Sequence, residues 1–215
     1  MKEILILAGV LVALAVLRKA VPFLLAHFVG GVVGRAIGSH ALAQQPDTIH
    51  LEKCTTESWS NASAVQPLVA PLLQRGFHDA GVFRVREMAG LTLQLLVKSD
   101  ESLIAAVYEH PQAGHWVDLA ARYQSGRSVT YSTSKPSGLV DRPGHPVHNA
   151  PGADVGSLLV RMRSEMPKQP LQQLTPFTAP RLFEHAYAEA MGYRKAKGIS
   201  AREVANVAER MDRAA

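Results

Sequence analysis

Cysteine is almost absent from this sequence of 215 residues, since Cys54 is the only one. An intrachain disulfide is therefore impossible, which is compatible with a reducing compartment. The three residues before Cys54 are Leu51, Glu52 and Lys53, whereas lipidation signals of bacterial lipoproteins have small residues there. We therefore expect no lipid anchor at this cysteine.

The common signatures of nucleotide-binding and hydrolytic enzymes are also missing. No glycine-rich run after a strand-like segment has the spacing of a phosphate loop, a dinucleotide fold or a kinase, and the sequence contains neither HExxH nor a nucleophile elbow. The folded part lacks a basic surplus as well, because the first 43 residues carry +3 of the net charge of +5. We therefore predict no cofactor and no nucleic-acid partner.

Polar side chains are absent from residues 4–17, which read ILILAGVLVALAVL. A helix of this length rises about 21 Å, which is short for a hydrocarbon core of about 30 Å. Lys2, Arg18 and Lys19 can lengthen the span by snorkelling. The pattern predicts a single-pass transmembrane helix over residues 3–20 in a plasma or inner membrane, with residues 21–38 as a membrane-associated continuation.

Two other interpretations of this end of the chain stay open. The apolar runs 4–17 and 20–34 could cross the bilayer as a hairpin with Arg18 and Lys19 at its turn, or the whole stretch could be a long signal sequence cleaved after Ala43. With one span, the basic residues near it place the following domain in the cytoplasm, whereas a hairpin returns that domain to the outside.

Small residues recur at every fourth position within the second apolar run, at Ala26, Gly30, Gly34 and Gly38. They share one helical face, which lets two helix backbones approach closely in lipid. The pattern resembles a glycine zipper of bacterial membrane proteins and predicts a homo-oligomer packed through this helix in the lipid bilayer. The alternative is a flexible linker that leaves the membrane.

The rest of the chain is typical of an α+β domain. Turn residues separate five strand-like segments, which are 83–86, 91–98, 103–108, 117–123 and 129–133. Apolar and polar residues alternate with a period of two in four of them, whereas 103–108 is apolar throughout. A short helix at 66–75 precedes these segments, and an irregular stretch and three helical patterns follow them. We expect Asp154 to cap the first helix, Gly192 to end the second, and Ser200 with Glu203 to form a capping box for the third.

We predict an α+β fold in which a five-stranded antiparallel meander has one polar face and one core face. The C-terminal helices cover one face of this sheet. The domains are an anchor (1–43), a linker (44–62) and a soluble domain (63–215).

Histidines are the only candidates for reactive chemistry. His145 and His148 lie in the long irregular stretch, and His110 and His115 flank one predicted turn. If the two loops converged, these imidazoles could bind zinc. The alternative is that they are solvated residues of surface connectors.

Arginines on the predicted strands are candidates for binding an anion. Arg84 and Arg86 alternate with apolar residues, and Arg122 occupies a comparable place on another segment. They could form an anion-binding patch on the polar face of the sheet, or they could be an ordinary solvated face.

The layout resembles that of bacterial proteins that join a short membrane anchor to a small α+β domain. We therefore expect a membrane-anchored domain that binds a small ligand or an as yet unknown protein partner near the bilayer. The alternative is a membrane-tethered, metal-dependent hydrolase that uses His145 and His148. A third interpretation is a membrane assembly factor driven by its N-terminal helix.

Overall fold

The computed structural model describes residues 40, 42–55 and 58–212. The predicted membrane anchor lies outside these residues, and so does the small-residue stripe at Ala26, Gly30, Gly34 and Gly38. Within the described part, no helix combines the length and the apolar character that a membrane span requires. The chain divides into two units, one of which comprises residues 46–196. The described residues of the other unit are treated separately below.

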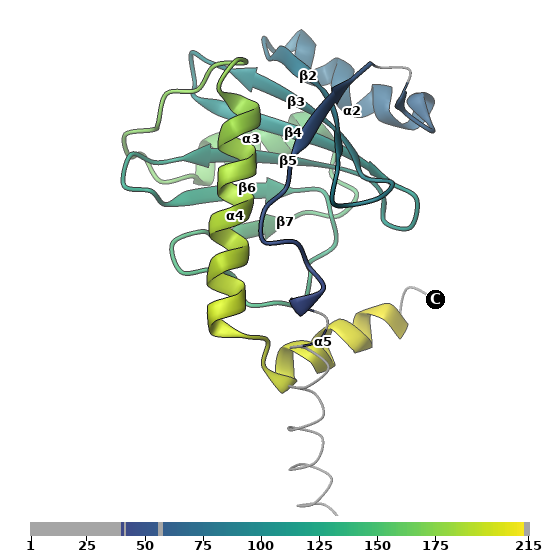
Figure 1. Cartoon of the computed structure of the whole chain (residues 1–215). Coiled ribbons are helices and arrows are strands. Elements are labelled where there is room, and N and C mark those ends of the chain that lie inside the picture. The colour runs from purple at the N-terminus through teal and green to yellow at the C-terminus, as the bar shows by residue number, and fades with distance from the viewer. Residues whose placement is uncertain (1–39, 41, 56–57, 213–215) are drawn as a thin grey trace, which may run out of the picture. The chain divides into compact units, whose positions relative to one another are not determined.

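The unit formed by residues 46–196 is built on one seven-stranded sheet, with the strands in sequence order (Figure 1). All neighbouring strands are antiparallel except the last pair, which is parallel. The strands are β1 (Leu51–Cys54), β2 (His78–Val85), β3 (Thr92–Lys98), β4 (Leu103–His110), β5 (Gly114–Arg122), β6 (Ser128–Ser132) and β7 (Val147–Asn149).

The five predicted strands are confirmed as β2 to β6, but the sheet is mixed and contains two further edge strands. β1 lies in the segment predicted as a linker, where Leu51 pairs with Val85 of β2. β7 lies in the stretch predicted as irregular, where His148 pairs with Tyr131 of β6. Strands of four and three residues are too short to show a period, so only pairing with a neighbour defines them.

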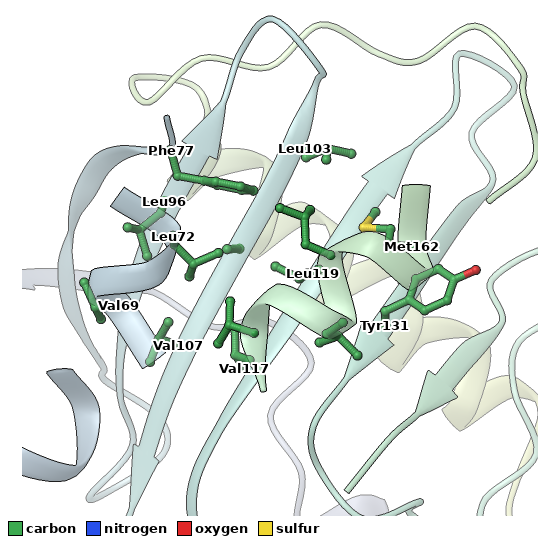
Figure 2. Packing of buried hydrophobic residues seen from close by; sticks show 14 of the residues in the cluster. Val69, Leu72, Phe77, Leu96, Leu103, Val107, Val117, Leu119, Tyr131 and Met162 are labelled. Atoms are coloured by element: carbon green, nitrogen blue, oxygen red, sulfur yellow. The ribbon is translucent and has the colours of Figure 1, made fainter. Parts of the chain in front are cut away.

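One face of the sheet packs against two helices, α2 (Ala62–Gln74) and α3 (Val155–Glu165). Figure 2 shows Leu72 of α2 and Met162 of α3 beside Leu119 of β5 in this core. Trp59, which lies in the predicted linker, is also buried here. This face holds the larger of the two hydrophobic clusters.

The other face is covered as well, so the expectation of one polar face is wrong. Helix α4 (Ala179–Lys197) crosses this face (Figure 1), and its Leu182 and Phe183 pack on a second cluster around Leu93 and Leu95. The sequence carried a sign of this arrangement, because Leu95, Leu96 and Val97 are consecutive apolar residues and all three are buried. Such runs are typical of strands that are covered on both sides.

Local capping signals define the helix starts well and the helix ends less well. Asp154 caps α3 as predicted, with its side chain accepting a hydrogen bond from the backbone N–H of Ser157. Helix α2 begins earlier than predicted, at the Asn61 cap, and continues past Pro71 to Gln74. The expected stop at Gly192 is wrong, because α4 continues to Lys197.

In the second unit, the described residues include helix α5 (Ala201–Asp212). The Ser200 hydroxyl and backbone N–H both donate to Glu203, and the Glu203 N–H donates to the Ser200 hydroxyl. The predicted capping box is therefore confirmed.

Candidate functional site

A pocket of about 380 Å³ lies between α4 and the face of the sheet that α4 covers. Its apolar wall is formed by Ile104, Ala106 and Ala120 from β4 and β5, and by Leu182, Phe183 and Ala186 from α4. Ala106 and Ala120 on the sheet and Ala186 on α4 have small side chains, which leave this space unfilled where larger side chains would occupy it. Strand pairing fixes the alignment, since Ile104 lies opposite Ala120 and Ala106 lies opposite Asp118.

Asp118 forms one polar end of the pocket. Its Oδ1 atom is buried and has no hydrogen-bond partner within the part of the chain that the structure describes. Burial raises the pKa of Asp118 to about 6, although hydrogen bonds to the side chains of Ser132, Tyr108 and Trp116 oppose the shift. The carboxylate is therefore mostly ionised at neutral pH, and its buried Oδ1 lacks a donor among the described residues.

Aromatic rings surround this end. Tyr108 stacks on Trp116 with a centroid distance of 4.6 Å and lies 6.3 Å from the ring of Phe183. Burial, together with the nearby charge of Asp118, raises the pKa of Tyr108 well above its usual value. Tyr108 therefore stays a protonated phenol, and the aromatic wall restricts water around the carboxylate.

The other end of the pocket carries both signs of charge. Nη2 of Arg122 lies 3.0 Å from Oε1 of Glu189, and Nη1 of Arg142 lies 3.5 Å from Oε2. His185 is also within 3.1 Å of Glu189. Hydrogen bonding to Arg122, and then the positive charges around it, lower the pKa of Glu189. With Arg194 and Asp141, three arginines and two carboxylates line this end.

The Arg122 end is more open to solvent than Asp118 Oδ1. The side chains of Arg122, Glu189 and Arg142 are 24%, 27% and 28% exposed. A ligand can therefore leave a polar group at this end in contact with water, whereas a group that reaches Oδ1 of Asp118 has to be desolvated.

The irregular stretch between β6 and α3 supplies part of the wall. His145 comes from this stretch, and its Nδ1 lies 2.8 Å from the Ser128 hydroxyl on β6. Burial and the charges of Arg142 and Arg122 lower the pKa of His145. Its imidazole is therefore uncharged at neutral pH and acts as a neutral hydrogen-bonding group.

The structure does not bring the four predicted metal ligands together. His145 lines the pocket, whereas His148 points to the opposite face of the sheet, where it stacks on Tyr131 at 4.7 Å. His110 and His115 lie at the turn between β4 and β5, and His115 Nε2 is 3.2 Å from Glu109. Among the described residues, no three histidine, cysteine or acidic side chains form a group that could hold a metal ion.

The three predicted anion-binding arginines are separated too. Arg84 and Arg86 lie on the face that packs against α2 and α3, and Arg86 pairs with Glu52 at 2.5 Å. Arg122 lies on the opposite face, and β3 and β4 separate its strand from β2. Of the three, only Arg122 lines the pocket.

Sequence reasoning missed Asp118, Arg142 and Glu189. Asp118 alternates with Val117 and Leu119, so it was assigned to a solvated polar face. Glu189 lies on a helix whose facing strand the pattern does not identify. A carboxylate among small apolar residues on a strand that is covered on both sides would have been the useful signal.

The comparisons provide no relative from which to transfer a function: no family model, no curated protein and no solved structure matches the chain. The chemistry therefore follows from the pocket itself. It offers an apolar wall, a buried carboxylate oxygen at one end, and arginines paired with carboxylates at the other.

Proposed function

We propose that residues 46–196 form a binding domain for a small molecule with a largely apolar body. The pocket between α4 and the sheet carries this proposal. Its volume of about 380 Å³ lies within the range typical of small-molecule sites, which are concave and mostly apolar with a few placed polar groups. Water leaving the apolar wall provides the driving force for binding.

The shape of the site favours a small molecule over a protein partner. A specific protein interface buries on the order of 800 Å² on each side, whereas this site is a single recess between α4 and the four strands β4 to β7. Phe183 and Leu182 line the recess and are only half-buried. A ligand placed against them would bury further apolar surface.

We further propose that residues 4–17 hold this domain at a plasma or inner membrane, on the cytoplasmic side. The support is the run without polar side chains and the basic residues Arg18, Lys19 and Arg35 that follow it. Tethering suits an apolar ligand, which concentrates in the bilayer. Protease treatment of intact cells tests the side: we expect the domain to be protected, and digestion from outside would contradict this topology.

The stripe of Gly30, Gly34 and Gly38 supports a further proposal, that the chain forms a homo-oligomer through its N-terminal helix. Cross-linking in membranes tests it with Gly34→Ile, because the larger side chain keeps the helices apart. We expect fewer cross-linked oligomers than in the wild type. Unchanged oligomers would argue against the stripe.

Photolabelling tests the ligand-binding function directly. The full chain, in lipid nanodiscs, is irradiated with an aryl trifluoromethyl diazirine carrying a hydroxymethyl group, and the labelled peptides are mapped by mass spectrometry. We expect labels on the pocket walls, chiefly on the peptides that contain Ile104 and Phe183. Mapping separates these labels from labels in the apolar N-terminal segment.

A matched pair of variants on α4 provides the control. Ala186→Leu places a larger side chain in the pocket, whereas Ala196→Leu makes the same change on the same helix at an exposed position that does not line it. We expect Ala186→Leu to reduce labelling of the pocket peptides severalfold and Ala196→Leu to leave it unchanged. Equal labelling of both variants, or no label in the pocket, would contradict the proposed function.

A further inference from the structure

The two ends of the pocket differ in what they can bind, and this difference defines the ligand more closely. Asp118 and Arg122 lie on the same face of β5, four residues apart. At about 3.3 Å per residue, their Cα atoms are about 13 Å apart. Ala120 lies between them on the same face, so an apolar wall joins a carboxylate end to an arginine end.

The carboxylate end has one atom that the protein leaves without a partner. Oδ1 of Asp118 is buried and accepts no hydrogen bond within the described residues. A buried carboxylate oxygen without a donor costs free energy, and a ligand that provides the donor recovers it. An ionised carboxylate can only accept hydrogen bonds, so a ligand acceptor or anion at this place would be repelled.

We infer that the pocket selects a molecule with an apolar body whose inner end donates a hydrogen bond to Oδ1 of Asp118, as a hydroxyl or an ammonium group. This inference rests on the proposed ligand-binding function and names the ligand's polarity. The groups around Asp118 agree with it. Tyr108, Trp116 and Ser132 hydrogen-bond to the carboxylate and hold it in place, while Phe183 and Ala106 offer only apolar contact.

The arginine end suits a hydrogen-bond acceptor of the ligand, whereas the Asp118 end suits a donor. Arg122 and Arg142 both pair with Glu189, so this end already has a counter-charge and does not require one from the ligand. An oxygen of the ligand could still accept a hydrogen bond there in contact with water. The selective contact is therefore the one at Asp118, where a wrong group cannot be solvated.

Three probes with the same aryl trifluoromethyl diazirine body test the inference on the full chain in lipid nanodiscs at pH 7.5. They carry a hydroxymethyl, an aminomethyl or a carboxylate group. We expect the two donor probes to label the peptides that contain Tyr108 and Phe183 on the order of tenfold more efficiently than the carboxylate probe, as one strong hydrogen bond predicts. Labelling in the N-terminal segment serves as the reference for partition into lipid.

Two variants identify the responsible atom. Asp118→Asn keeps an acceptor oxygen and removes the charge, so the aminomethyl probe should lose more labelling than the hydroxymethyl probe. Asp118→Leu keeps the branching and the number of side-chain heavy atoms, is somewhat larger and has no acceptor, so both donor probes should fall to the level of the same probe carrying a methyl group. The Asn variant keeps the test informative if the Leu variant does not fold.

The outcomes separate this inference from the function on which it rests. Equal labelling of the pocket by all three probes, or labelling unaffected by either Asp118 variant, would overturn the inference and leave the ligand-binding function standing. Labels found only in the N-terminal segment, with every probe, would overturn the function itself.

Discussion

Arg122 on β5 donates two hydrogen bonds to Glu189 on α4, with Nη2 3.0 Å from Oε1 and 3.1 Å from Oε2. The two residues are 67 positions apart in the chain. This pair joins the helix to the sheet at the open end of the pocket, while Leu182 and Phe183 hold the helix by apolar contact further back. It therefore helps to set the distance between α4 and β5.

The contribution of this ion pair is measurable in a double-mutant cycle with Arg122→Gln and Glu189→Gln. Both side chains are about a quarter exposed, so solvent screens the pair and we expect a coupling free energy of no more than about 1 kcal/mol. Urea unfolding of the four proteins measures it. Single variants whose effects simply add would show that the pair does not hold α4.

Asp118→Asn should change how stability depends on pH. The pKa of Asp118 is about 6 in the folded state and near 3.8 when unfolded, so the fold favours the protonated acid. Wild-type stability relative to the Asn variant is therefore highest below pH 4 and falls as the pH rises through 6, by about 1–3 kcal/mol in total. Thermal unfolding between pH 4 and 8 measures this, and a pH-independent difference would contradict the buried, ionisable carboxyl.

The adjacent pair Leu72 and Leu73 tests the core beneath α2. Leu72 is fully buried, whereas Leu73 is 46% exposed. We expect Leu72→Ala to lower the free energy of unfolding by about 2–4 kcal/mol and Leu73→Ala by less than about 0.5 kcal/mol. Similar losses in denaturant unfolding would mean that the helix faces the sheet differently.

The capping box of α5 predicts a local effect. Ser200→Ala removes the hydroxyl that bonds Glu203, and we expect a cost of about 1 kcal/mol to the helix. Amide hydrogen exchange should become about fivefold faster in the first turn of α5. The control Ser99→Ala, at an exposed turn, should leave that exchange unchanged, and equal rates in the two variants would argue against the cap.

Alternation of apolar and polar residues predicts a strand only where it extends over enough residues. β5 and β6 were predictable because residues such as Val117, Leu119 and Tyr131 alternate with polar ones over a sufficient length. β1 and β7 were not, because Leu51 and His148 join the sheet only through a partner strand that lies elsewhere in the chain.

The candidate site was likewise predictable only in part, because some of its residues have a local signal and others depend on distant parts of the chain. Arg122 and His145 were identified as candidates, but their expected companions Arg84 and His148 lie on the other face of the sheet. Spacing in the chain gives the face of a strand relative to its neighbours in sequence. It does not show which helix covers that face, and so the pocket and Asp118 were not predicted.

The amino-acid sequence by itself determined the elements whose signals are local: the five longer strands, through alternation or a short apolar run between turns, and the starts of α3 and α5, through the Asp154 cap and the Ser200–Glu203 box. Only the tertiary structure decided that both faces of the sheet are covered and that a pocket remains under α4. The physical reason is the separation along the chain of the residues on which each feature depends. A cap or a period depends on neighbouring residues, whereas a pocket depends on whether residues distant in the chain, such as Ala120 and Ala186, come to line the same recess.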